Sequence, residues 1–166
     1  MKKNRKKILP DGNPSELGMI IDNSILLCAP LSPTQNVRDR QHWSTKNKYR
    51  NLAYSILRDQ IRRLAGGGYT QPIWNKVILE FVRCSMGTVM ADTANIIGGL
   101  KSIIDVLQCS RTVQMRKTGN LRDYPGIGLF KEDSPKYVTL GSIEDRPRGH
   151  WKDLPGPGTW VKVIPL

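Results

Sequence analysis

Short apolar runs bounded by turn residues predict strands in the first, middle and last parts of the chain. The run Ser24–Ala29 (SILLCA) is ended by Pro30, and residues 73–85 are rich in β-branched and aromatic side chains. Residues 136–143 are a further strand candidate, and residues 159–164 (TWVKVI) alternate between apolar and polar positions. Four strands are therefore expected.

Two other segments have the three- and four-residue spacing of amphipathic helices. The first starts near Thr45, where Ser44 or Thr45 can cap it, and a glycine run at 66–68 stops it. The second follows Asp92 and Thr93, either of which can be its cap. Their apolar positions are Tyr49, Leu52, Ala53, Ile56, Leu57, Ile61 and Leu64, and then Ile96, Ile97, Leu100, Ile103, Ile104 and Leu107.

The second helix contains a Gly98-Gly99 pair. Each glycine costs about 1 kcal/mol relative to alanine in a helix interior. The pair therefore predicts either a local kink or the close approach of another backbone, such as that of a dimer mate.

Strand-rich ends that flank two helices predict one α+β domain with a mixed sheet and two main helices, covering residues 19–166. Residues 1–18 are charged, polar and punctuated by Pro and Gly, which predicts a flexible basic arm. Pro30 and Pro33 predict an extended loop before the first helix. Residues 109–130 and 146–158 have the composition of basic loops.

The net charge of the chain indicates which class of partner it binds. Its 166 residues include 26 Lys and Arg against 14 Asp and Glu, a net charge of +12 at pH 7. Such a surplus predicts a polyanionic partner, with DNA the first choice, although it also suits a solvated basic surface without a partner.

The cysteines and histidines do not form a zinc pattern. Cys28, Cys84 and Cys109 are far apart, and His42 and His150 lie near none of them with ligand spacing. We expect reduced thiols in a reducing compartment. The basic start lacks a following apolar segment, and no run approaches the roughly 18 apolar residues of a membrane span, so we expect a cytoplasmic, nucleoid-associated protein without membrane contact.

Cations and aromatic rings are interleaved between Pro30 and Leu52. Cations bind a phosphate backbone, while Trp43 and Tyr49 could each stack on a base or anchor the loop to the core. Both alternatives stay open for each ring. The expected DNA contacts are Arg38, Arg40, His42, Trp43, Lys46, Lys48, Arg50, Arg146 and Arg148.

Carboxylates and a lysine gather around the second helix. Asp92 stands at its expected N-terminus, where the helix dipole favours an ionised carboxylate. Lys101 could neutralise charge on a phosphate, or form an ordinary i,i+4 pair with Asp105. Glu132-Asp133 precedes a predicted strand, where Asp133 is either a site residue or a turn residue.

The order of these residues resembles that of the RusA-like Holliday-junction resolvases, small endonucleases found mainly in phages and prophages. The resemblance covers about residues 24 to 164. It implies a homodimeric, Mg²⁺-dependent endodeoxyribonuclease that nicks four-way DNA junctions symmetrically, in the cytoplasm of a bacterial host cell. The segments that carry it are Asp92-Thr-Ala-Asn95, Lys101-Ser-Ile-Ile-Asp105-Val-Leu107 and Glu132-Asp133-Ser134.

The family motif is close to D-x-D-N-x-x-K-x-x-x-D. Lys101 matches its lysine if about one helical turn of extra residues is allowed after Asn95. The resemblance implies that Asp92 and Asp133 hold Mg²⁺ and act in catalysis with Lys101. The supporting residues it implies are Asn95, Asp105 and Glu132.

The second Asp of the motif falls on Ala94, whose methyl group cannot bind a metal ion. Magnesium takes oxygen ligands, often one or two carboxylates with water and substrate phosphate, so Asp92 and Asp133 could still hold one ion. Two hypotheses follow. The chain is either a junction-cutting endonuclease, active or inactivated by Ala94, or a non-catalytic protein of the same fold that binds junction or duplex DNA.

Overall fold

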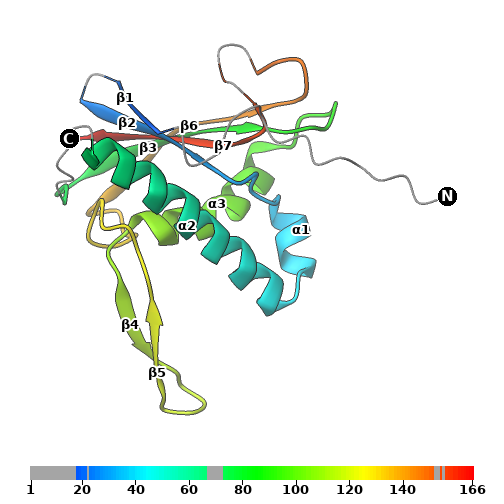
Figure 1. The fold of residues 1–166 in the computed structure, drawn as a ribbon. Helices are drawn as coiled ribbons and strands as arrows, with labels where there is room; N and C mark the ends of the chain where they lie inside the picture. Colours follow the sequence, from blue (N-terminus) through cyan, green and yellow to red (C-terminus); the bar gives the residue numbers. More distant parts are fainter. Residues whose placement is uncertain (1–17, 22, 67–72, 152–153, 155) are drawn as a thin grey trace.

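The structure, a computed structural model, describes residues 18–21, 23–66, 73–151, 154 and 156–166. Of the expected basic arm, residues 1–18, all but Gly18 lie outside the described residues. The described chain forms a five-stranded mixed sheet, a two-stranded hairpin and three helices (Figure 1), which confirms the predicted α+β class.

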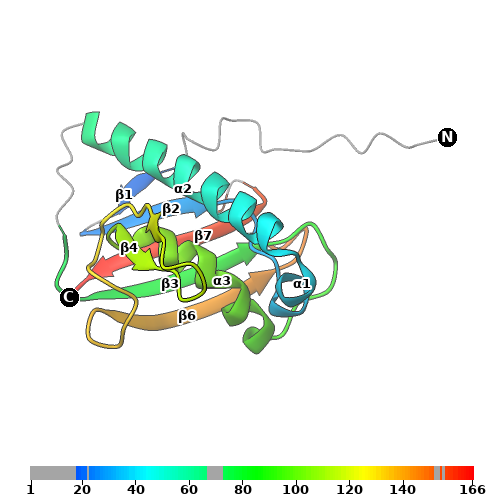
Figure 2. The ribbon, with the colours of Figure 1, turned by 90° about the horizontal axis from the view of Figure 1, so that it is seen from below.

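The central sheet has the strand order β1-β2-β7-β3-β6 (Figure 2). Strand β7 is antiparallel to β2 and β3, whereas β3 and β6 run parallel. All four predicted strands are present as β2, β3, β6 and β7. The strands are β1 (Met19–Ile21), β2 (Ser24–Ala29), β3 (Val77–Cys84), β6 (Val138–Arg146) and β7 (Gly158–Pro165).

One face of the sheet is covered by the helices, as both views show (Figures 1 and 2). Most of the predicted apolar positions of the two main helices face this core, where Leu57 and Leu100 pack with Phe81 of β3 and all three are 0% exposed. Leu52 and Ile97, predicted to lie on the same apolar sides, are instead 51% and 41% exposed. The helices are α1 (Gln35–Arg40), α2 (Trp43–Gly66) and α3 (Thr93–Leu107).

A smaller apolar cluster contains Cys28, Cys84 and Trp160. Trp160 alternates along β7 with the core residue Val161, so strand geometry places this cluster on the opposite face of the sheet. Burial, and then the neighbouring Cys84, raise the pKa of the Cys28 thiol to about 12, which leaves this thiol protonated at neutral pH.

Helix α1 and the start of α2 differ from the sequence prediction. Helix α1 occupies part of the segment predicted to be an extended loop, and α2 begins at Trp43. Ser44 and Thr45 therefore lie inside the first turn of α2 and are not its cap. Instead, the backbone N–H of Ser44 donates to His42 Nδ1 at 3.3 Å.

A β-hairpin replaces the predicted loop after α3. Its strands are β4 (Arg111–Gln114) and β5 (Leu121–Tyr124), and it projects away from the sheet and helices (Figure 1). None of its eight strand residues is buried. The sequence did not reveal these strands because they lack a buried face, so no apolar alternation marks them.

The glycine pair in α3 lets another part of the same chain approach the helix. A Cβ atom on Gly99 would lie 1.7 Å from the carbonyl oxygen of Pro33, and one on Gly98 would lie 2.4 Å from Oε1 of Gln35. Arg38 also donates to the carbonyl oxygen of Gly98 at 3.1 Å. The close approach comes from this chain's own segment before and within α1, and not from a dimer mate.

We predict that Gly99→Ala lowers the free energy of unfolding by about 1–3 kcal/mol, the usual cost of overpacking. The clash with the backbone at Pro33 should outweigh the better helix propensity of alanine, which is worth about 1 kcal/mol. Urea denaturation followed by circular dichroism measures the change. Gly66→Ala is the control, because a Cβ there has nothing within 4 Å. Equal stability of the two variants would contradict the prediction.

Candidate functional site

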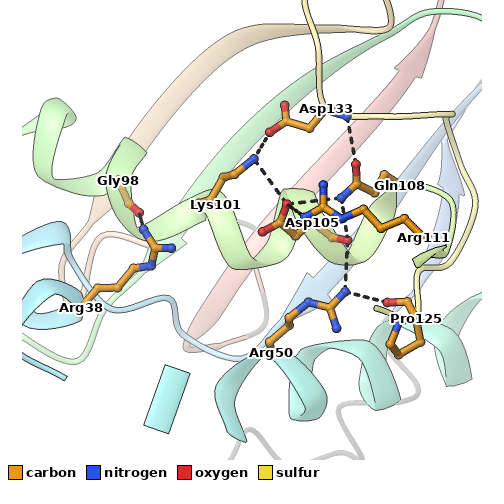
Figure 3. A network of polar contacts seen from close by, with 9 residues as sticks. All are labelled: Arg38, Arg50, Gly98, Lys101, Asp105, Gln108, Arg111, Pro125 and Asp133. Atoms are coloured by element: carbon orange, nitrogen blue, oxygen red, sulfur yellow. Dashed lines mark hydrogen bonds and ion pairs between the residues drawn. The ribbon is translucent and has the colours of Figure 1, made fainter. Parts of the chain in front are cut away.

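Two carboxylates converge on one lysine beside the C-terminal half of α3. Lys101 Nζ lies 3.3 Å from Oδ1 of Asp105, one turn later in the helix, and it also forms an ion pair with Asp133 (Figure 3). Asp133 lies in the segment before β6, and its backbone N–H donates to Oε1 of Gln108 at 3.0 Å. Gln108, the C-cap of α3, therefore holds this segment so that the Asp133 carboxylate points at Lys101.

The Asp105 carboxylate has further partners. Its Oδ1 lies 3.4 Å from Nη2 of Arg111, the first residue of β4, and it accepts a hydrogen bond from Gln108 at 3.3 Å. The side chains of Asp105 and Asp133 are 17% and 26% exposed. Both carboxylates are thus held in place by neighbouring groups and still reachable from solvent.

Lys101 is a cation at neutral pH. Its partial burial acts to lower the pKa, but the hydrogen bond with Asp133 and the charge of Asp105 outweigh it and raise the pKa above the ordinary lysine value. A lysine in this state cannot accept a proton near pH 7. It can neutralise negative charge, which is the electrostatic role predicted for it.

A hollow of about 320 Å³ opens beside this group, between α3 and the start of β6. Lys101 and Asp133 provide its charged lining, and Ser134 contributes a hydroxyl group. Its apolar side is formed by Ile97, Ile104, Pro135, Val138 and Leu140.

Asp92 is the N-cap of α3, which was predicted to be either Asp92 or Thr93. Its Oδ1 accepts the backbone N–H of Asn95 at 3.0 Å, and its Oδ2 accepts the side-chain amide of the same residue. These two hydrogen bonds lower the pKa of the exposed Asp92 carboxyl below its usual range. Asn95, predicted to support a metal site, here supports the cap.

The structure does not bring Asp92 and Asp133 together. Asp92 follows Ala91, whose N–H donates to Asp145 at the far end of β6, whereas Asp133 lies before the start of β6. Along α3, Asp92 is about 13 Å of helix axis from Lys101 at about 1.5 Å per residue. The Asp92–Asp133 pair therefore does not fit a single metal ion, and the exposed Ala94 lies in the first turn of α3 with Asp92.

Asp105 and Asp133 fit a magnesium ion better, since two reachable carboxylates with water and phosphate are a usual Mg²⁺ ligand set. No group of three or more His, Cys, Asp or Glu side chains is placed to hold a metal within the residues that the structure describes. Glu132 is exposed, and it lies 3.4 Å from the hydroxyl of Ser134.

Several predicted DNA contacts are used inside the protein. Arg38 donates to Gly98, and the buried Arg50 donates to the carbonyl oxygen of Pro125 at 2.7 Å. Arg146 Nη2 lies 2.8 Å from Oε2 of Glu144. Lys46 is half-buried, and the remaining predicted contacts are exposed: Arg40, His42, Trp43, Lys48 and Arg148.

The two aromatic rings of the basic segment have different environments. Tyr49 donates its hydroxyl to the carbonyl oxygen of Pro30 at 2.8 Å, and burial is the main cause that raises its pKa above the ordinary value. It is therefore an anchor of the loop. Trp43 is 62% exposed, which leaves its face available for stacking.

Two features of the structure lie outside the sequence-predicted site. Asp145 is buried and lies 3.0 Å from Arg83, an ion pair between β6 and β3. At the base of the hairpin, the guanidinium groups of Arg50, Arg111 and Arg122 lie 5.4, 5.7 and 5.2 Å from the ring centre of Tyr124. The basic composition of residues 109–130 hinted at the second feature, but only pairing of the strands brings these groups together.

Comparisons of the chain with protein-family models, curated proteins and solved structures found no significant match. Within the described part of the chain, no helix is both long and apolar enough to cross a bilayer.

Proposed function

We propose that this protein is a Mg²⁺-dependent endodeoxyribonuclease of the RusA-like kind, which cuts branched DNA such as four-way junctions. The observation that carries the proposal is the convergence of Asp105 and Asp133 on Lys101 at a solvent-reachable hollow. The net charge of +12 supports a nucleic-acid substrate.

Asp105 and Asp133 would hold the ion in this proposal. When bound, magnesium would polarise the scissile phosphate and lower the pKa of an attacking water. Lys101, whose side chain is 44% exposed, can move its ammonium group on a flexible stem and neutralise charge on the phosphate. Arg111 and Gln108 keep the Asp105 carboxylate in position.

The wider setting of the proposal follows the resemblance. A homodimer would relate two such sites by a two-fold axis, which suits symmetric cutting of opposed strands. We propose that the protein acts in the cytoplasm, associated with the nucleoid of a bacterial host.

A second candidate is a non-catalytic protein of the same fold that binds junction or duplex DNA. It is favoured by the separation of Asp92 from Asp133 and by the alanine at position 94, because both remove ligands that the family motif would supply. In this candidate function, the basic surface still binds DNA, but the protein does not hydrolyse it.

Cleavage of a labelled four-way junction separates the two candidates. We expect the protein to cut the junction with Mg²⁺, but not with EDTA, and to leave a linear duplex of the same arm sequence intact. Binding should weaken by about 10³–10⁵-fold between about 50 and 200 mM salt if six to ten phosphates are contacted. Salt-sensitive binding without any cleavage would favour the second candidate, and binding insensitive to salt would count against both.

A further inference from the structure

The β4–β5 hairpin is an exposed ribbon with two chemically different faces. Directly paired residues of an antiparallel ladder share a face, so Arg111 and Tyr124 lie on the same side as Val113 and Arg122. We call these four residues the cationic face. The other side carries Thr112, Gln114, Leu121 and Asp123.

Charge on the hairpin is strongly one-sided. Asp123 is the sole carboxylate of residues 110–124, and it is on the second face, where it accepts a hydrogen bond from Thr112 at 2.6 Å. On the cationic face, Arg111 and Arg122 lie over the ring of Tyr124. This face therefore offers fixed guanidinium groups and an aromatic ring, a combination suited to phosphates and bases.

The tip of the hairpin is ordered by its own hydrogen bonds. The backbone N–H of Met115 donates to Asn120 at 2.8 Å, and Gly119 adopts a positive φ of 69° and donates to Met115 at 2.8 Å. Arg116 and Lys117 lie within this turn and are both exposed. No ion pair holds either of them within the described residues, so the tip presents two cations without internal neutralisation.

The base of the hairpin is fixed to the candidate site. Arg111 contacts Asp105, and the neighbouring Ser110 hydroxyl accepts the N–H of Gly126 at 3.0 Å. Arg50 of α2 reaches both Pro125 and the ring of Tyr124. A ligand lying along the cationic face would therefore meet the Asp105–Lys101–Asp133 group at its base.

The size of the ribbon selects the kind of ligand. Four-residue strands span about 14 Å at about 3.4 Å per residue. The major groove of B-form DNA, about 12 Å wide and about 8.5 Å deep, admits a two-stranded ribbon, whereas that of double-stranded RNA is too narrow for side chains to read. An isolated hairpin with both faces exposed is also marginally stable, which fits an element completed by a ligand.

We propose that the β4–β5 hairpin is an arm that enters the major groove of duplex DNA through its cationic face and its basic tip. The inference rests on the proposed function, since it assumes a DNA substrate, and it adds how a duplex arm is gripped beside the acidic residues. None of the hairpin residues belongs to the DNA contacts expected from the sequence.

The test compares binding of the full chain to a labelled DNA duplex and four-way junction in EDTA. Arg116→Gln/Lys117→Gln should raise Kd at least about tenfold and reduce the slope of log Kd against log salt by about two, as two lost phosphate contacts require. The matched control is Arg62→Gln/Arg63→Gln, which removes two exposed cations from the last part of α2 and should bind like the unmodified chain.

Two further measurements address the groove. Arg122→Gln should weaken binding, while Asp123→Asn, on the other face, should not. Dimethyl sulfate should methylate guanine N7 less in the bound duplex, because N7 faces the major groove, and this protection should disappear in the tip variant. Double-stranded RNA of the same sequence should bind more weakly than DNA.

The outcomes separate this inference from the proposed function. Three results would overturn the proposal that the hairpin enters the major groove and would leave the nuclease proposal standing. They are an unchanged DNA affinity of the tip variant, an equal loss of DNA affinity in the α2 control variant, and tighter binding to double-stranded RNA than to DNA. Hairpin-dependent, N7-protecting binding by a chain that does not cut would support the arm and reject the nuclease. A chain that binds no DNA at all would overturn both.

Discussion

Asp133→Asn is expected to reduce Mg²⁺-dependent cleavage of a four-way junction by at least about 100-fold, because even outer-shell partners of a metal ligand are worth 10–100-fold. The substitution keeps the shape of the side chain and removes the charge that faces Lys101. Asp105→Asn should have a similar effect. Single-turnover cleavage of labelled junctions measures both rates, and anisotropy checks that junction binding survives.

Glu132→Gln is the matched control for this prediction. It removes the same charge from the adjacent residue, whose exposed carboxylate accepts a hydrogen bond from the hydroxyl of Ser134 at 3.4 Å. Its cleavage rate should equal that of the unmodified chain. A loss as large as that of Asp133→Asn would show a general effect of local charge and reject the assignment of Asp133.

Asp92→Asn distinguishes the geometry from the resemblance. Asparagine caps helices as well as aspartate does, so α3 should remain intact. The resemblance predicts loss of cleavage, because Asp92 matches a family metal ligand, whereas the distance along α3 predicts that cleavage is retained. If Asp92→Asn abolished cleavage while the stability of the protein was unchanged, Asp92 would be assigned as a metal ligand in place of Asp105.

Asp145→Ala is expected to lower the free energy of unfolding by about 3–5 kcal/mol, the range for removing one partner of a buried ion pair. The Asp145 side chain is 1% exposed, lies 3.0 Å from Arg83 Nη1 and accepts the N–H of Ala91 at 2.7 Å. Its loss leaves the Arg83 guanidinium without its carboxylate, although Nε still donates to the carbonyl oxygen of Ser32 at 2.9 Å, and leaves the N–H of Ala91 without its acceptor. Urea denaturation followed by tryptophan fluorescence measures the change.

Two controls accompany this variant. Glu144→Ala removes a 48% exposed neighbour paired with Arg146 and should change stability by less than about 1 kcal/mol. The double variant Arg83→Met/Asp145→Leu removes both charges and should recover much of the lost stability. A small loss for Asp145→Ala, equal to that of Glu144→Ala, would mean that the ion pair does not hold β6 to β3 in solution.

Local and periodic features were predictable from the chain alone. The apolar residues of each main helix follow a three- and four-residue spacing because such positions lie on one side of a helix. Leu57 and Leu100 belong to these two series, and the structure buries both. The Asp92 cap depends on the N–H of Asn95, three residues away, so it too is visible in the sequence. The basic composition of residues 109–130 is also visible in the sequence, but the β-hairpin that these residues form was not predicted from it.

The sequence by itself determined the α+β class, the two main helices, the four longer strands and the positive charge, because each depends on spacing or composition within a short segment. Only the tertiary structure decided which charges meet. Lys101 and Asp133 are 32 positions apart, and they meet because the backbone N–H of Asp133 donates to Gln108 and positions the segment before β6. Packing also buries Arg50 and places Asp92 far from Asp133. Such contacts depend on how distant segments pack together, which spacing along the chain does not encode.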